Sequence, residues 1–178
     1  MSAEDQFESA LVEPDKNLFI QMLTRDVELV PAILDLWDNS VDGALRFVKR
    51  DDDGNFVEKS LDGFQIDISV NSDSFSIVDN CGGISLVTAR DYAFRLGRSQ
   101  DTPSVDGAVG SFGVGMKRTL FKMGDNFRVE SDSIDGSFAL EVDVPHWAAL
   151  KEDVWAFPFE KADPDSSVVD PRLSLIHI

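Results

Sequence analysis

One stretch of the sequence, residues 35–44, limits the possible folds more than any other. It reads D-L-W-D-N-S-V-D-G-A, and on a helix its Asp35, Asn39 and Asp42 lie within roughly 60° of one another. The rest of this helix carries the apolar residues Ile33, Leu34, Trp37, Val41, Ala44 and Leu45. The pattern therefore predicts a helix that docks on a core through these apolar residues and presents a line of carboxylate, amide and carboxylate on another side.

The polar line has two interpretations. An asparagine amide can ligate Mg²⁺ without adding charge, and a carboxylate one turn away can orient a water molecule, so the line is typical of a metal–phosphate site. The alternative is an ordinary solvated polar face. We expect the helix to begin after a cap at Thr24 or Asp26 and to end near Phe47.

Composition excludes several classes of partner. The chain of 178 residues is 43% hydrophobic, which is enough for one domain with a core, and its formal net charge is -17. Nucleic acid and anionic membranes require basic surfaces, so we expect neither as a direct partner. A polyanion such as ATP would have to be bound by backbone N–H groups, a helix N-terminus, Mg²⁺ and one or two basic side chains.

Cysteine content and hydropathy add further limits. Cys81 is the only cysteine, which excludes a disulfide within the chain and a cysteine-based zinc site. No apolar run approaches ~18 residues, and the N-terminus lacks the basic and apolar regions of a signal peptide. A cytoplasmic location is therefore expected.

The remaining elements predict an α+β domain. Residues 17–23 form a short apolar element, helix or strand, and residues 64–70 and 75–78 alternate as an antiparallel pair of strands. Ser85 is a cap for a helix that runs to about Leu96, and a helix over 116–123 ends at Gly124. Residues 126–130 and 137–144 form a second hairpin. Residues 97–115 are rich in Gly, Ser and Asp, as expected of a lid or binding loop, with Gly107 and Gly110 as its hinges.

Three motifs in order carry the strongest functional signal. They are D-N-S-V-D at 38–42, I-V-D-N-C-G-G-I at 77–84 and G-S-F-G-V-G-M-K at 110–117. Together they resemble the GHKL ATPase superfamily (gyrase B, heat-shock chaperones, histidine kinases and MutL), most closely the MutL, MORC and heat-shock types. The resemblance spans roughly residues 18–144. It implies a Bergerat-type α/β sandwich, with a mixed, mostly antiparallel sheet, helices on one face and an ATP lid.

The resemblance also implies roles for individual residues. Asn39 corresponds to the Mg²⁺-binding asparagine, and Asp35 stands where the family usually has the glutamate that activates water. Asp42 matches an acidic position of the nucleotide pocket. Asp79 would accept a hydrogen bond from the adenine amino group; the alternative for Asp79 is a residue of a strand-ending turn. Cys81 replaces the first glycine of the family's D-x-G-x-G pattern.

Further positions are implied around the phosphates. Gly83 keeps the second glycine of that pattern, and Ser99 lies at the base of the lid. The glycine-rich segment and the helix after it would bind the phosphates through Gly110, Phe112, Gly113, Val114, Gly115 and Lys117. For Lys117 the alternative is an exposed helix lysine.

These implications lead to a functional hypothesis. We expect an ATP-binding, Mg²⁺-dependent ATPase domain, slow in hydrolysis, whose lid closure powers a conformational change or dimerisation of a larger protein. The homodimer would form through regions outside this domain. The alternatives are a histidine-kinase-like phosphotransfer domain and an ATP sensor or interaction module that does not hydrolyse.

The domain organisation follows from the same patterns. Residues 1–16 are an acidic arm, and residues 17–172 are the ATP-binding domain, truncated at its C-terminal side. Residues 173–178, L-S-L-I-H-I, resemble a translated sequencing adapter and are expected to be a non-native tail outside the fold.

Overall fold

The computed structural model describes residues 15–57, 61–95, 114–150, 155–163 and 173–178. The helices are α1 (Lys16–Thr24), α2 (Leu29–Leu45), α3 (Leu86–Thr88), the π-helical turn η1 (Ala89–Ala93), α4 (Gly115–Met123) and α5 (Val144–Ala149). The strands are β1 (Ile66–Val70), β2 (Phe75–Asp79), β3 (Asn126–Ser133), β4 (Gly136–Asp143), β5 (Phe159–Asp163) and β6 (Leu173–His177).

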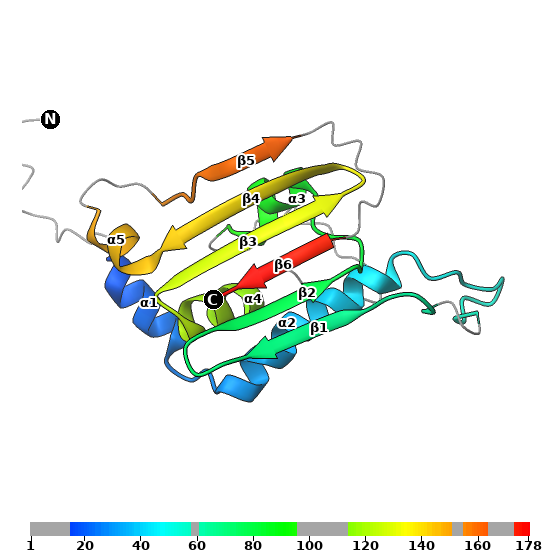
Figure 1. The fold of residues 1–178 in the computed structure, drawn as a ribbon, viewed down its shortest axis with the longest axis horizontal. Coiled ribbons are helices and arrows are strands. Elements are labelled where there is room, and N and C mark those ends of the chain that lie inside the picture. Colours follow the sequence, from blue (N-terminus) through cyan, green and yellow to red (C-terminus); the bar gives the residue numbers. More distant parts are fainter. Residues whose placement is uncertain (1–14, 58–60, 96–113, 151–154, 164–172) are drawn as a thin grey trace, which may run out of the picture.

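The strands form one six-stranded sheet in the order β1-β2-β6-β3-β4-β5, and every pairing is antiparallel. Helices α1, α2 and α4 lie behind this sheet in the view of Figure 1, so these helices cover one face of the sheet. The α+β class and the layer of helices on one face confirm the predicted architecture.

Side-chain alternation explains the covered face. In β3 every second residue from Phe127 to Ser133 is buried, and in β2 the buried residues are Phe75, Ile77 and Asp79. The buried apolar side chains meet α2 and α4 through residues such as Leu36 and Leu120. The predicted β1–β2 pair is confirmed, with Ile68 opposite Ile77.

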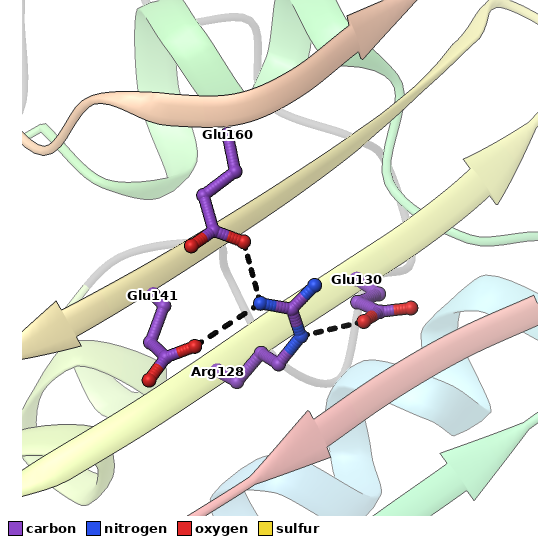
Figure 2. Close-up of polar contacts among 4 residues, drawn as sticks. All are labelled: Arg128, Glu130, Glu141 and Glu160. Atoms are coloured by element: carbon purple, nitrogen blue, oxygen red, sulfur yellow. Dashed lines mark hydrogen bonds and ion pairs between the residues drawn. The ribbon is translucent and has the colours of Figure 1, made fainter.

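An ion-pair cluster ties three strands together on the other face of the sheet. Arg128 of β3 contacts Glu130 on its own strand (Nε to Oε1, 2.6 Å), Glu141 on β4 (Nη1 to Oε2, 3.1 Å) and Glu160 on β5 (Nη1 to Oε2, 2.5 Å), as Figure 2 shows. The hydrogen bonds that Arg128 donates to Glu130 and Glu160 raise the pKa of its guanidinium. One cation therefore holds three carboxylates from three strands.

Helix α2 differs from the prediction in its orientation. The predicted cap residues Thr24 and Asp26 do not begin it; it starts at Leu29, after Glu28, which makes no side-chain cap hydrogen bond. Its buried residues are Ala32, Leu36, Ser40, Asp42, Gly43 and Ala44. The prediction that Leu34 and Trp37 dock on the core was wrong. They are 53% and 40% exposed. Small residues on the buried side let the helix approach its neighbours closely, which the larger side chains would prevent.

Two other elements settle points that the sequence left open. The segment at 17–23 belongs to helix α1, whose cap Asp15 accepts a hydrogen bond from the Leu18 backbone N–H at 2.6 Å. The helix after Ser85 ends earlier than expected, at Ala93, and Ser85 caps it by accepting from the Thr88 N–H. Among the described helices none has both the length and the apolar character needed to cross a membrane.

The segment 173–178, which we expected to lie outside the fold, contributes β6 (Leu173–His177) between β2 and β3. Ile176 is buried and pairs with Ile77 on one side and Val129 on the other. The alternating apolar pattern of this segment suits a strand, and it satisfies the backbone groups of two neighbouring strands. The origin of the segment as a non-native tail stays a prediction.

The contribution of β6 can be measured. We expect Ile176→Ala to lower the free energy of unfolding by about 3 kcal/mol, because it removes buried apolar volume from the centre of the sheet. The matched control is His177→Ala, whose side chain is exposed, with an expected change below about 0.5 kcal/mol. Urea unfolding followed by circular dichroism measures both. Equal stability of the two variants would show that β6 does not pack as described.

Candidate functional site

The centre of the site is the carboxylate of Asp79, the last residue of β2. Asp79 lies on the same buried face of the strand as Phe75 and Ile77, and it is 7% exposed. Its Oδ1 accepts a hydrogen bond from the Cys81 backbone N–H at 2.8 Å, and its Oδ2 accepts from the hydroxyls of Ser40 (2.8 Å) and Ser174. Three donors from three segments therefore fix the orientation of this carboxylate.

A cavity that opens to solvent lies over this carboxylate. Helix α2 contributes Leu36, Asn39, Ser40 and Gly43, followed along the chain by Arg46. The sheet and the helix ends add Ile77, Asp79, Cys81, Gly83, Ile84, Met116, Val129, Ser174 and Ile176. Apolar walls around one buried acceptor suit a flat heterocycle with an amino group, and a purine such as adenine has both features.

The turn after β2 contains two glycines, of which Gly83 lines the cavity. Gly82 and Gly83 have φ of 102° and 63°, a left-handed conformation that glycine adopts without strain. A side chain at Gly83 would collide with the Asp132 carbonyl oxygen and lie 2.7 Å from the Ser131 hydroxyl. Ser131 also accepts from the Ile84 N–H at 2.6 Å and donates to the Ile84 carbonyl at 3.1 Å. The turn at Gly82 and Gly83 therefore packs directly against β3.

Helix α2 touches the same turn from the other side. A Cβ atom at Gly43 would lie 2.6 Å from the Cys81 carbonyl oxygen, so only glycine permits this approach. Arg46 donates from Nη2 to the Gly83 carbonyl at 2.7 Å. Burial lowers the pKa of Arg46, against the opposing effect of the Asp42 and Asp79 charges.

Cys81 occupies the position of the missing first glycine as a packed side chain. It is 1% exposed, and burial, together with the nearby Asp79 charge, raises the pKa of its thiol to about 12. The thiol is therefore neutral at physiological pH, and a neutral buried thiol is not a nucleophile. The left-handed backbone conformations of this turn are at Gly82 and Gly83.

Asp35 lies beside the first turn of α4. A Cβ atom built on Gly115 would lie 3.0 Å from the Asp35 Oδ2, so the Asp35 side chain lies against the first residue of α4. The Thr119 hydroxyl fixes the two helices by donating to the Ala32 carbonyl at 3.0 Å. Val114, the cap residue of α4, makes no side-chain cap hydrogen bond, so the first N–H groups of this helix have no side-chain acceptor there.

The other predicted residues divide into three groups. Asn39 lines the cavity, and Asp42 is buried on α2 but is not among the lining residues. Lys117 is 5% exposed and donates to the Arg95 carbonyl at 2.5 Å; burial lowers its pKa. The remaining four, Ser99, Gly110, Phe112 and Gly113, lie outside the described residues.

The sequence reasoning missed several contributors. Ser40 and Ser174 donate to Asp79, and Arg46 and Met116 line the cavity. Ser40 directly follows Asn39, so its position was available, but its hydroxyl partner depends on the packing of α2 against β2. The role of Ser174 depends on the placement of β6, which sequence patterns do not give.

The side chains at the cavity could supply only some of the ligands of a magnesium ion. Among the described residues, no three His, Cys, Asp or Glu side chains gather as a metal cluster. The Asn39 amide lies at the cavity wall and the Asp35 carboxylate is one turn away on the same helix. Such a set fits a Mg²⁺ ion whose remaining ligands are phosphate oxygens and water, as is usual for this ion.

Comparison with known families identifies the type of domain. A family model described as histidine kinase-, DNA gyrase B-, and HSP90-like ATPase matches residues 27–168, which include α2, the Asp79 turn and α4. No individual curated protein matches the chain.

The glycine turn provides a test of this geometry. We expect Gly83→Ala to lower the free energy of unfolding by about 3 kcal/mol, since the new methyl group adds a collision with β3 to the backbone strain. Gly54→Ala is the matched control, because Gly54 has φ of 83° but nothing within 4 Å of a built Cβ. It should cost about 1 kcal/mol, which is the strain alone. Similar losses in urea unfolding would contradict the described contact with Ser131 and Asp132.

Proposed function

Because the chain belongs to the histidine kinase-, DNA gyrase B- and HSP90-like ATPase family, whose domains bind ATP, we propose that it is a Mg²⁺-dependent ATPase module. The observation that carries the proposal is the cavity over the buried Asp79 carboxylate, with Asn39 in its wall. Asp35 lies on α2, the same helix as Asn39, and its side chain is next to Gly115, the first residue of α4.

Asp79 is proposed to recognise adenine. Ser40 and Ser174 both donate to Oδ2 and the Cys81 N–H donates to Oδ1, so one acceptor site remains, on Oδ1, and it points in a fixed direction. A charged acceptor in a cavity with apolar walls selects an amino group over a carbonyl at the same position. We therefore expect adenine nucleotides to bind better than guanine nucleotides.

Asn39, Asp35 and α4 are proposed to act on the phosphate end. Mg²⁺, when bound, neutralises charge on the phosphate oxygens, and the Asn39 amide oxygen would be its protein ligand. The first N–H groups of α4, together with Gly115, would receive the phosphates. Asp35 would orient the attacking water molecule and accept its proton.

We also propose that nucleotide binding drives a conformational change or dimerisation of a larger protein. The support is the resemblance of S-F-G-V-G to a lid motif, most of which lies outside the described residues. A second candidate, an ATP sensor without turnover, is favoured by Asp35 itself. Its side chain is one CH₂ shorter than the glutamate of related proteins, which places its carboxylate farther from a water molecule at the γ-phosphate.

Calorimetry tests the nucleotide site. We expect ATP binding that requires Mg²⁺ and is at least tenfold weaker in Asn39→Ala and Asp79→Asn, since each change removes one directed contact to the ligand. Asp79→Asn keeps one acceptor oxygen for the Cys81 N–H, so the fold should persist. Asp73→Asn, in the exposed β1–β2 turn, is the matched control and should leave affinity unchanged. Wild-type protein that is folded yet ignores millimolar ATP would contradict the proposal.

Phosphate release tests the role of Asp35. We expect Asp35→Asn to reduce turnover by about 100-fold or more while ATP affinity stays within about twofold, because the amide cannot accept the proton of water. Asp38→Asn makes the same chemical change three residues further along α2 and should retain full turnover. Equal losses in both variants would argue against Asp35 as the base. ATP binding by the wild type without phosphate release would instead support the sensor.

A further inference from the structure

Helix α2 carries an apolar surface that the described part of the chain leaves largely exposed. Val30, Leu34 and Trp37 are 65%, 53% and 40% exposed, although all three are large and apolar. Their spacing of four and three residues places them within roughly 60° of one another on the helix. We refer to these three residues as the α2 stripe.

The α2 stripe is separate from the nucleotide cavity. The residues that α2 contributes to the cavity are Leu36, Asn39, Ser40 and Gly43, and none belongs to the stripe. At about 100° per residue, Leu34 and Asn39 point in directions roughly 140° apart. A molecule bound to the stripe would thus leave the cavity open, and the two sites share only the rigid helix between them.

The charges next to the stripe are mostly negative. The acidic residues nearest to it in the sequence are Asp26, Glu28 and Asp38, and the exposed Arg25 directly precedes Asp26. Asp26 and Glu28 are exposed next to Val30, and Asp38 follows Trp37 directly. An apolar surface with an acidic rim attracts a ligand with an apolar surface and a basic rim. It also repels a second copy of itself, and the whole chain carries a net charge of -17.

The spacing of the stripe indicates the shape of the ligand. Apolar residues that alternate at four and three positions form the seam by which two helices pack along their length. Exposed helix faces of this kind receive amphipathic helices whose anchors follow the same spacing. A flat or extended ligand would not use this periodicity.

From these observations we propose that the α2 stripe docks an amphipathic helix of a partner protein, with an apolar seam flanked by lysine or arginine. The partner would lie along α2, on the helix that carries Asn39 and Asp35 on another side. This surface goes beyond the proposed ATPase function and does not depend on it.

A designed peptide can test the proposal with the full chain. The probe is a fluorescently labelled helical peptide of about 18 Leu and Lys residues with its leucines on one face. We expect micromolar binding by fluorescence anisotropy, and binding at least tenfold weaker to the double variant Leu34→Gln/Trp37→Gln. Leu18→Gln on α1 is the matched control, because Leu18 is 56% exposed, and it should bind the peptide as the wild type does.

Three further measurements can overturn the proposal. A scrambled peptide of the same composition that binds equally well would show that charge alone is responsible. Equal weakening by Leu18→Gln would show that the stripe has no special role. A wild-type dimer in sedimentation at physiological salt, lost in the double variant, would identify a second copy as the ligand. Unchanged circular dichroism of all variants, expected for exposed positions, excludes unfolding as the cause of lost binding.

Discussion

The hydrogen bonds that converge on the Asp79 carboxylate are the constraint on which the rest of the structure depends. They join four segments: β2 through Asp79 itself, α2 through Ser40, the glycine turn through the Cys81 N–H, and β6 through Ser174. Hydrogen bonds to a charged group are stronger than those between neutral groups, and burial increases the cost of losing one. The acceptor proposed to recognise adenine therefore also determines where α2 lies on the sheet.

This double role explains why glycine stands at two particular places. Gly43 lets α2 come close enough for Ser40 to reach Asp79, and Gly83 lets the turn fit between that helix and β3. A larger residue at either place would move one wall of the cavity relative to the carboxylate. The shape of the site is thus set by packing and backbone conformation before any ligand binds.

The sequence predicted those features that depend on local pattern. Alternation over residues 64–70 and 75–78 predicted the β1–β2 pair, and the helical period of residues 35–44 placed Asp35 and Asn39 about 40° apart around one helix. Sequence could not decide that Leu36 rather than Leu34 faces the core, because the choice depends on how closely Ala32 and Gly43 approach other elements. The place of β6 and the partners of Arg128 depend on strand pairing between distant segments, which local patterns do not contain.

The basic residues of this acidic chain bind backbone carbonyls as well as carboxylates. Lys16 donates to the Trp147 carbonyl at 3.3 Å and lies 5.0 Å from the centre of that indole ring, Arg46 donates to Gly83, and Lys117 donates to Arg95. Each ties a helix or a turn to a distant segment. Cations used in this way neutralise few of the acidic side chains, so the surface keeps its strong negative potential.

Arg128 has an evolutionary consequence that follows from its geometry. Its planar guanidinium reaches carboxylates on β3, β4 and β5 at once, whereas the single ammonium of a lysine cannot present the same fork. If Arg128 were lost by drift, three like charges would remain together on adjacent strands and repel one another. Loss of Arg128 is therefore easier to accommodate in a lineage that has also lost one or more of Glu130, Glu141 and Glu160, so changes at these four positions should be correlated among descendants of this sequence.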